Sequence, residues 1–282
     1  MKDRLGYTDE TTRRCERALI TLIGNIGPWS KRIYLAGGLA PLYIVGPLPD
    51  AASPHIGTTD VDMVIGLMID DAVETYSTLQ ANLKKTGFKQ TQLSYQWERE
   101  VDGVNVLVEF MCETDQVEPG SIHRPKQGTG SKVGAFNVPG AQLAVRDFTV
   151  HQVAGKRLDE GGLSTVELQV VGVLTFTVLK ILAFQDRHEN KDAYDLVYTL
   201  LNYPGGPAGA GRVAADTEIA SLPQVVNALD LLQRRFETTD HDGPVAHATF
   251  LGDPQDTDAD DRLRNEAVYT IRQFLEAFRS SH

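Results

Sequence analysis

Short apolar segments rich in β-branched and aromatic residues divide the N-terminal half of the chain, and this pattern predicts strands. The expected strands cover residues 32–36, 58–67, 88–101 and 104–111. The last two are joined by Asp102-Gly103, a dipeptide typical of a tight hairpin turn. Apolar residues at helical spacing predict helices over 10–26, 39–45 and 70–86, the last with Asp70 as its N-cap.

Helical spacing dominates the rest of the chain. It predicts helices over residues 164–186, 190–201, 222–238 and 260–279, with the Pro/Gly-rich segment 204–211 as an internal linker. The expected fold class is therefore α+β: a mixed sheet with flanking helices in residues 1–158, followed by a helical domain in residues 159–282.

Composition narrows the possible functions. The net charge of −11 argues against a protein that coats nucleic acid non-specifically. A local basic segment remains, and it is expected either to face RNA or a triphosphate or to be a solvated loop; its residues include Arg124, Lys132 and Arg157. No apolar run approaches the roughly 20 residues of a membrane helix, and the N-terminus lacks an apolar signal region, so we expect a cytoplasmic protein with no membrane partner. Cys15 and Cys112 are expected to be thiols without a disulfide or metal role.

Two aspartates carry the most specific chemistry. Asp60 and Asp62 are two positions apart on a predicted strand, so both side chains project from the same face. Neighbouring carboxylates repel each other unless a cation lies between them. Mg²⁺, or Mn²⁺ in its place, suits such a pair because it takes one or two carboxylates and fills its other positions with water and phosphate oxygens. A solvated strand end is the alternative interpretation.

Three further features favour the metal site. Gly37-Gly38 follows a predicted strand and is expected to open a helix, where backbone N–H groups can hold a phosphate. Thr58 and Thr59 precede the aspartate pair with hydroxyls that can support a ligand or a carboxylate. Glu109 interrupts an otherwise apolar strand and is either an exposed-face residue or a third metal ligand.

The order of these parts resembles the nucleotidyltransferase superfamily that includes DNA polymerase beta. The stretches that carry the resemblance are LAGGLAPLYIV, TTDVDMVI and VLVEF. The resemblance implies that Asp60, Asp62 and Glu109 hold Mg²⁺ ions while Gly37 and Gly38 bind the triphosphate of an NTP. Thr59 is a further candidate for nucleotide binding because of its hydroxyl. The family has Ser or Thr directly after the second glycine, whereas this chain has Leu39, so a hydroxyl contact to phosphate is missing.

A second resemblance lies in the helical half. The pattern Lys180, Ala183, Arg187, Lys191-Asp192-Ala-Tyr-Asp195-Leu196 is similar to a signature of the AbiE-type abortive-infection nucleotidyltransferases, the toxins of type IV toxin–antitoxin pairs. It implies that Lys180 contacts nucleotide phosphate and that Asp195 belongs to the active site. It also implies transfer of a nucleoside monophosphate to a tRNA 3′ end, with a cognate antitoxin as partner; an antibiotic or a protein hydroxyl is the alternative acceptor.

Two other functions stay open at this point. A glycosyltransferase also uses Asp-x-Asp to hold a metal and a nucleotide-sugar, but it requires a longer series of strand–helix units before Asp60 than the chain has room for. A degenerate nucleotidyltransferase domain kept as a binding or regulatory module is the other alternative. Leu39 favours it, and the presence of all three carboxylates opposes it.

Overall fold

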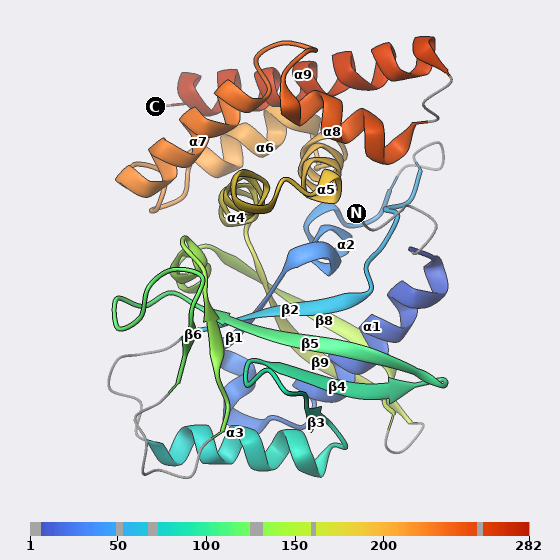
Figure 1. Ribbon diagram of the computed structural model, residues 1–282, viewed down its shortest axis with the longest axis vertical. Coiled ribbons are helices and arrows are strands. Elements are labelled where there is room, and N and C mark those ends of the chain that lie inside the picture. Colours follow the sequence, from blue (N-terminus) through green and yellow to red (C-terminus); the bar gives the residue numbers. More distant parts are fainter. Residues whose placement is uncertain are drawn as a thin grey trace. The chain divides into compact units, whose positions relative to one another are not determined.

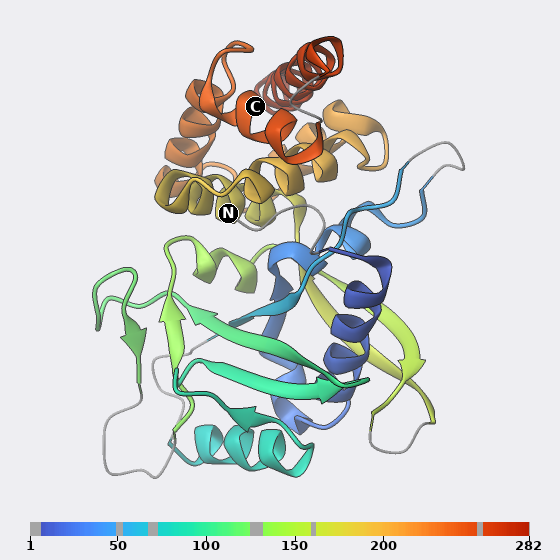
Figure 2. The ribbon, with the colours of Figure 1, turned by 45° about the vertical axis from the view of Figure 1, so that its right-hand side comes forward.

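A computed structural model describes residues 7–48, 53–66, 73–124, 132–158, 162–252 and 256–281. The chain divides into two compact units, which are coloured along the sequence in Figures 1 and 2. The sheet unit comprises Tyr7–Ala40 and Gly57–Val171. The helical unit takes Pro41–Ile56 and everything described from Gly172 onward. The boundary expected at residue 158 therefore differs from the observed division, which falls between Val171 and Gly172.

One mixed sheet forms the centre of the sheet unit, which agrees with the α+β fold class expected from the sequence. In the described residues its strands run in the order β3-β4-β5-β2-β1-β9-β8, with β7 pairing to β5 and β6 to β7. The strands are β1 (Ile33–Ala36), β2 (Asp60–Ile65), β3 (Lys89–Gln90), β4 (Gln96–Val101), β5 (Val104–Cys112), β6 (Ile122–His123), β7 (Ala135–Asn137), β8 (Phe148–Lys156) and β9 (Leu163–Val171).

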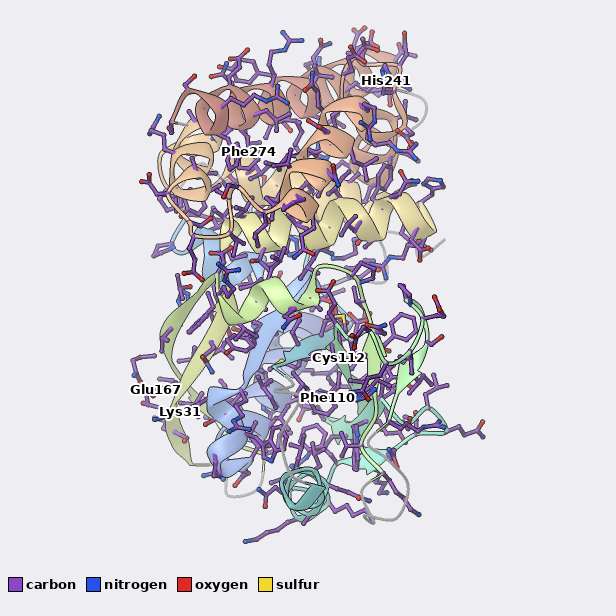
Figure 3. The ribbon with its side chains drawn as sticks, turned by 90° about the vertical axis from the view of Figure 1, so that its left-hand side faces the viewer. Lys31, Phe110, Cys112, Glu167, His241 and Phe274 are labelled. Atoms are coloured by element: carbon purple, nitrogen blue, oxygen red, sulfur yellow. The ribbon has the colours of Figure 1, made fainter. Side chains whose placement is uncertain are left out.

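The two faces of the central strands differ in burial, and this difference positions the candidate site. Along β5 the residues from Val106 to Cys112 alternate between buried and half-exposed positions. The buried set packs with helix α1 (Asp9–Ile23), whose apolar residues contact β2, β4, β5, β8 and β9. Figure 3 shows Phe110 and Cys112 among these interior side chains. The opposite side of β2, β4 and β5 is only partly covered, and we call it the half-open face.

Local sequence accounts well for the sheet unit. Helix α1 begins after the capping residue Thr8, whose hydroxyl accepts a hydrogen bond from the Thr11 N–H. The predicted hairpin is confirmed, because Val101 pairs with Val104 across the Asp102-Gly103 turn. The expected single strand over 88–101 is wrong in detail, since a turn at 91–95 separates β3 from β4. Helix α3 (Val73–Lys85) corresponds to the predicted helix, whereas its expected cap, Asp70, lies outside the described residues.

Helices make up the helical unit: α2 (Pro41–Val45), α4 (Val173–Arg187), α5 (Asn190–Leu201), α6 (Gly206–Ala215), α7 (Pro223–Arg235), α8 (Asp242–Leu251) and α9 (Thr257–Ser280). The ranges predicted for α5, α7 and α9 agree with the structure to within a few residues. Figure 3 labels Phe274 in the core of this unit, where its side chain is fully buried. Within the described ranges no helix combines the length and the apolar character needed to cross a bilayer.

Two predicted elements in the C-terminal half are wrong, and long-range contacts explain both. The helix expected from residue 164 is instead strand β9 up to Val171, because this segment pairs with β1 and β8. The expected linker 204–211 lies largely within helix α6. Gly211 packs so closely on α9 that a Cβ there would lie 2.9 Å from the Ala277 Cβ. The small residues of this segment therefore allow close helix packing, which overrides their low helix propensity.

Candidate metal and nucleotide site

The sheet register brings the predicted carboxylates into one row on the half-open face. Asp62 on β2 is the direct partner of Glu109 on the parallel strand β5, and Gln96 on β4 is the partner of Glu109 on the other side. Directly registered residues project from the same face of a sheet, on strands about 4.8 Å apart. Asp60 shares this face, because Val61 between the two aspartates is fully buried.

Gly37 closes the row beyond β2. Strand β1 pairs antiparallel with β2 so that Ala36 is the partner of Asp62, and the chain then turns at Gly37 with a positive φ of 63°. A Cβ at Gly37 would lie 2.6 Å from both the Cβ and the Cγ of Asp62. The Gly37 backbone therefore packs directly against the Asp62 side chain, at a distance that only glycine permits.

The helix expected after the glycine pair is wrong in form. Gly37–Leu39 is a single 3-10 turn, and the helix that follows, α2, has five residues and begins at Pro41. Gly38 and Leu39 are buried. The segment thus offers a tight glycine turn beside Asp62 rather than the N-terminus of a long helix.

The two threonines before Asp60 differ in their hydrogen bonds and burial. The Thr58 hydroxyl donates to Asp60 Oδ1 at 2.9 Å and is itself buried. The Thr58 N–H donates to the Thr12 hydroxyl on α1 at 3.4 Å, which fixes the start of β2 against that helix. Thr59 is half-buried, and its expected contact with a triphosphate stays a prediction. Thr58 is therefore the threonine that orients an aspartate.

The residues fit a hard divalent cation by the chemistry of their oxygen donors. Among the described residues, no group of three or more His, Cys, Asp or Glu side chains is already arranged to hold a metal ion. Mg²⁺ does not require such a cage, since it commonly takes one or two carboxylates together with water and substrate phosphates. Asp60, Asp62 and Glu109 on one partly exposed face meet that requirement.

Lys180 and Asp195 lie in the helical unit, at the centre of a buried ionic network. The Lys180 ammonium donates to Asp195 Oδ2 at 2.6 Å and to Asp192 Oδ1 at 3.0 Å, and only 6% of the residue is exposed. Lys191 bonds both oxygens of Asp195, at 2.8 and 2.9 Å. Arg187 binds Asp192 through two hydrogen bonds of 2.7 Å. The charges of Lys180 and Asp195, which the sequence suggested for catalysis, are therefore largely neutralised by partners within the network.

Sequence reasoning missed His55, which belongs to the same network. Its Nε2 lies 2.9 Å from Asp195 Oδ1, and its ring stacks on Tyr194 with centroids 5.2 Å apart. The Ile56 N–H donates to the Tyr194 hydroxyl at 2.8 Å, so residues 53–56 are held on helix α5. No sequence signal marks His55, because its partners lie about 140 positions away.

Burial and pairing shift the pKa values in this network in opposite directions. Burial opposes the charge on Asp195, but Lys180 and Lys191 outweigh it and hold the pKa of the carboxyl well below its usual range. Burial likewise opposes the Lys180 charge, and Asp195 with Asp192 nevertheless raises the pKa of the ammonium. Burial lowers the pKa of His55, so the ring is neutral near pH 7.

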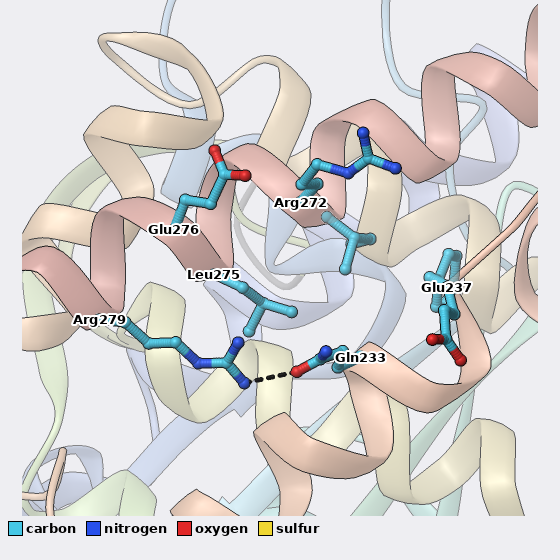
Figure 4. A pocket seen from close by; sticks show the side chains of 8 residues that line it. Gln233, Glu237, Arg272, Leu275, Glu276 and Arg279 are labelled. Atoms are coloured by element: carbon cyan, nitrogen blue, oxygen red, sulfur yellow. Dashed lines mark hydrogen bonds between the residues drawn. The ribbon is translucent and has the colours of Figure 1, made fainter.

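A groove of about 280 Å³ lies elsewhere in the helical unit, between α7 and α9 (Figure 4). Its floor consists of Phe236, Ile271 and Leu275, which are buried. Charged side chains of both signs surround it, and Arg279 donates to Gln233 across it at 2.6 Å. None of the candidate site residues lines this groove.

Comparisons with known proteins add little to this geometry. No family model matches the chain, and no curated protein matches it. The solved structure of the Bradyrhizobium diazoefficiens CD-NTase CdnG in complex with GTP aligns with 96% of this chain and 85% of that chain, at 12% sequence identity and a TM-score of 0.24. A TM-score this low carries no argument about fold or function, so the case rests on the residues themselves.

Proposed function

We propose that this chain is a metal-dependent nucleotidyltransferase, which transfers a nucleoside monophosphate from an NTP to a hydroxyl acceptor. One observation carries the proposal: Asp60, Asp62 and Glu109 project from the same half-open face, with Asp62 and Glu109 in direct register and Gly37 packed against Asp62. Three carboxylates side by side repel one another, and a cation-dependent function gives a reason to keep them together.

The reaction forms one bond and breaks one. The acceptor oxygen attacks the α-phosphorus, the bond from that phosphorus to the β-bridging oxygen breaks, and pyrophosphate leaves while the hydroxyl proton passes to solvent. A bound Mg²⁺ would supply charge neutralisation at the phosphates and a lower pKa for the acceptor hydroxyl. The chain's part is to fix the carboxylates through Thr58 and Gly37 and to offer the backbone of Gly37, the half-buried glycine of the pair, to phosphate.

The resemblance in the helical half implies a tRNA 3′ hydroxyl as the acceptor and an antitoxin as regulatory partner, and tRNA is therefore the acceptor that the labelling experiment below tests first. Within that motif we revise the roles of Lys180 and Asp195. Their mutual ion pair and their burial favour stabilisation of the helical unit over direct contact with a nucleotide.

Incubation of the purified protein with α-labelled NTPs, Mg²⁺ or Mn²⁺ and total cellular RNA tests the proposal. Wild-type protein is expected to label RNA of tRNA size, and Asp62→Asn is expected to abolish labelling because it removes a central carboxylate. Glu100→Gln is the matched control, since Glu100 is an exposed acid on β4, which is separated from the strand of Asp62 by β5. Labelling by Asp62→Asn at the wild-type rate would exclude this mechanism.

A second candidate is a binding module with the same fold and no turnover, and the burial of Leu39 favours it. Leu39 is fully buried, so the position that has a hydroxyl in the nucleotidyltransferase family serves core packing here. Labelling combined with isothermal titration of NTP and Mg²⁺ separates the two functions, because a binding module of this kind binds NTP in a metal-dependent way and gives no labelled product. The glycosyltransferase alternative is not pursued, since β1 is the one strand that precedes β2 in the described part of the chain.

A further inference from the structure

Gln96 contacts the carboxylate row, although the sequence did not single it out. It lies on β4 as the direct register partner of Glu109, and its side-chain amide donates to Glu109 Oε1 at 2.6 Å. Both side chains are half-buried on the half-open face. A hydrogen bond to a carboxylate is stronger than a neutral one, and partial shielding from water strengthens it further.

The orientation of the Gln96 amide is determined by its two neighbours. An ionised carboxylate only accepts hydrogen bonds, so the NH₂ group of Gln96 must face Glu109. The amide oxygen of Gln96 then points toward Thr91, whose hydroxyl donates to it at 3.0 Å. The Thr91 oxygen also accepts from the Leu93 N–H at 3.1 Å, which holds the threonine in the turn before β4. A chain of three polar groups thus ends on one oxygen of Glu109.

A second Gln–Glu pair in the same sheet allows a comparison, because it lies on an exposed hairpin and not on the half-open face. On the hairpin of β8 and β9, Gln152 donates to Glu167 at 3.0 Å, and the two residues are register partners. Both are exposed, and Figure 3 labels Glu167 at the surface of the sheet unit. The pair at Gln96 differs in being shorter, half-buried and extended to Thr91.

We infer that Gln96 is a positioning residue, which holds Glu109 Oε1 and so directs the Oε2 atom of Glu109 toward the cation of the candidate site. This inference rests on the proposed function. Gln96 donates a hydrogen bond without adding charge, so it stabilises the Glu109 carboxylate next to Asp62 and leaves the charge that a cation requires. Thr58 likewise donates an uncharged hydrogen bond to Asp60 at the start of β2.

Mn²⁺ binding to the full chain tests this role. The binding is measured by electron paramagnetic resonance in the presence of a non-hydrolysable analogue of each of the four NTPs in turn. Gln96→Met keeps the length of the side chain and removes the donor, and it is expected to weaken Mn²⁺ binding about tenfold. Gln152→Met is the matched control and is expected to bind Mn²⁺ as the wild type does. Thr91→Val, which leaves Gln96 in place but removes its support, is expected to weaken binding about threefold.

The outcomes separate the two proposals. Wild-type protein that binds no Mn²⁺ with any analogue would overturn the proposed function and the role of Gln96 together. Wild-type binding with equal affinities in Gln96→Met and Gln152→Met would overturn the positioning role alone. Fluorescence of the adjacent Trp97 reports whether the sheet is folded, and Thr91→Val keeps the inference testable if Gln96→Met does not fold.

Discussion

Replacing Gly37 with alanine probes how closely the glycine turn and Asp62 depend on each other. Gly37 has a φ of 63°, a region that costs an L-residue about 1–2 kcal/mol. The new Cβ would also lie 2.6 Å from the Asp62 Cβ and Cγ. The Cβ of Asp62 cannot rotate away from β2, so the backbone must shift, and overpacking of this kind typically costs about 1–3 kcal/mol. We expect a total loss of roughly 2–5 kcal/mol and a displaced carboxylate.

Gly103→Ala is a control that separates the two contributions. Gly103 has a φ of 78° in the hairpin turn, and a Cβ there meets nothing within 4 Å. This variant therefore carries the backbone strain without the clash and is expected to lose about 1 kcal/mol. The difference between the free-energy losses of the two variants measures the cost of the clash between the new Cβ and Asp62.

Tryptophan fluorescence gives the assay a selective signal. The chain has two tryptophans, and both Trp29 and Trp97 are buried in the sheet unit. Urea unfolding followed by this fluorescence therefore reports the free energy of unfolding of the sheet unit. Equal losses in Gly37→Ala and Gly103→Ala, together with unchanged Mn²⁺ binding, would refute the close packing of Gly37 on Asp62.

Three further predictions follow from buried groups. Asp195→Asn removes the buried carboxylate that pairs with both Lys180 and Lys191, so the helical unit is expected to lose about 3–5 kcal/mol in urea unfolding followed by circular dichroism; an unchanged midpoint would contradict a stabilising role. The lowered pKa of His55 stabilises the fold above the unfolded-state pKa near 6.5, so melting temperature should fall as the pH drops below that value, and His55→Gln should remove this step. Burial raises the pKa of Cys15 and Cys112 to about 12, so a thiol reagent should label them only after denaturation; fast labelling of native protein would contradict this.

The sequence predicts best those strands that are buried on one face of the sheet only. Strand β5 has buried residues from Val106 to Cys112 at every second position, and its polar residues, Asn105 and Glu109, both fall on the other face. Strand β9 gives the opposite case, because its second half is buried on both faces and loses the alternation. Its pairing of Gln169 with Tyr34 joins residues far apart in the chain, which no local pattern records.

The sequence predicts the carboxylates of the candidate site, but it does not predict all the residues that hydrogen-bond to them. Asp60, Asp62 and Glu109 interrupt apolar strands, so their residue types alone draw attention. Gln96 and His55 act through partners that the sheet register and the packing of residues 53–56 on α5 bring together. An ordinary glutamine or histidine acquires a role only through these tertiary contacts, and tertiary contacts are what a single sequence lacks.

The motif in the helical half shows why a spacing can mislead. Helices α4 and α5 pack against each other, so a lysine on the first and aspartates on the second meet whether or not a ligand is bound. Lys180 has two carboxylate partners and almost no exposure, and a phosphate would have to displace both of them. In the sheet unit, the Thr58 hydroxyl donates to Asp60 and the Gln96 amide donates to Glu109, and neither of these two hydrogen bonds adds a positive charge. The burial of Lys180 and its two ion pairs are the physical reason for proposing the reaction in the sheet unit and not at this motif.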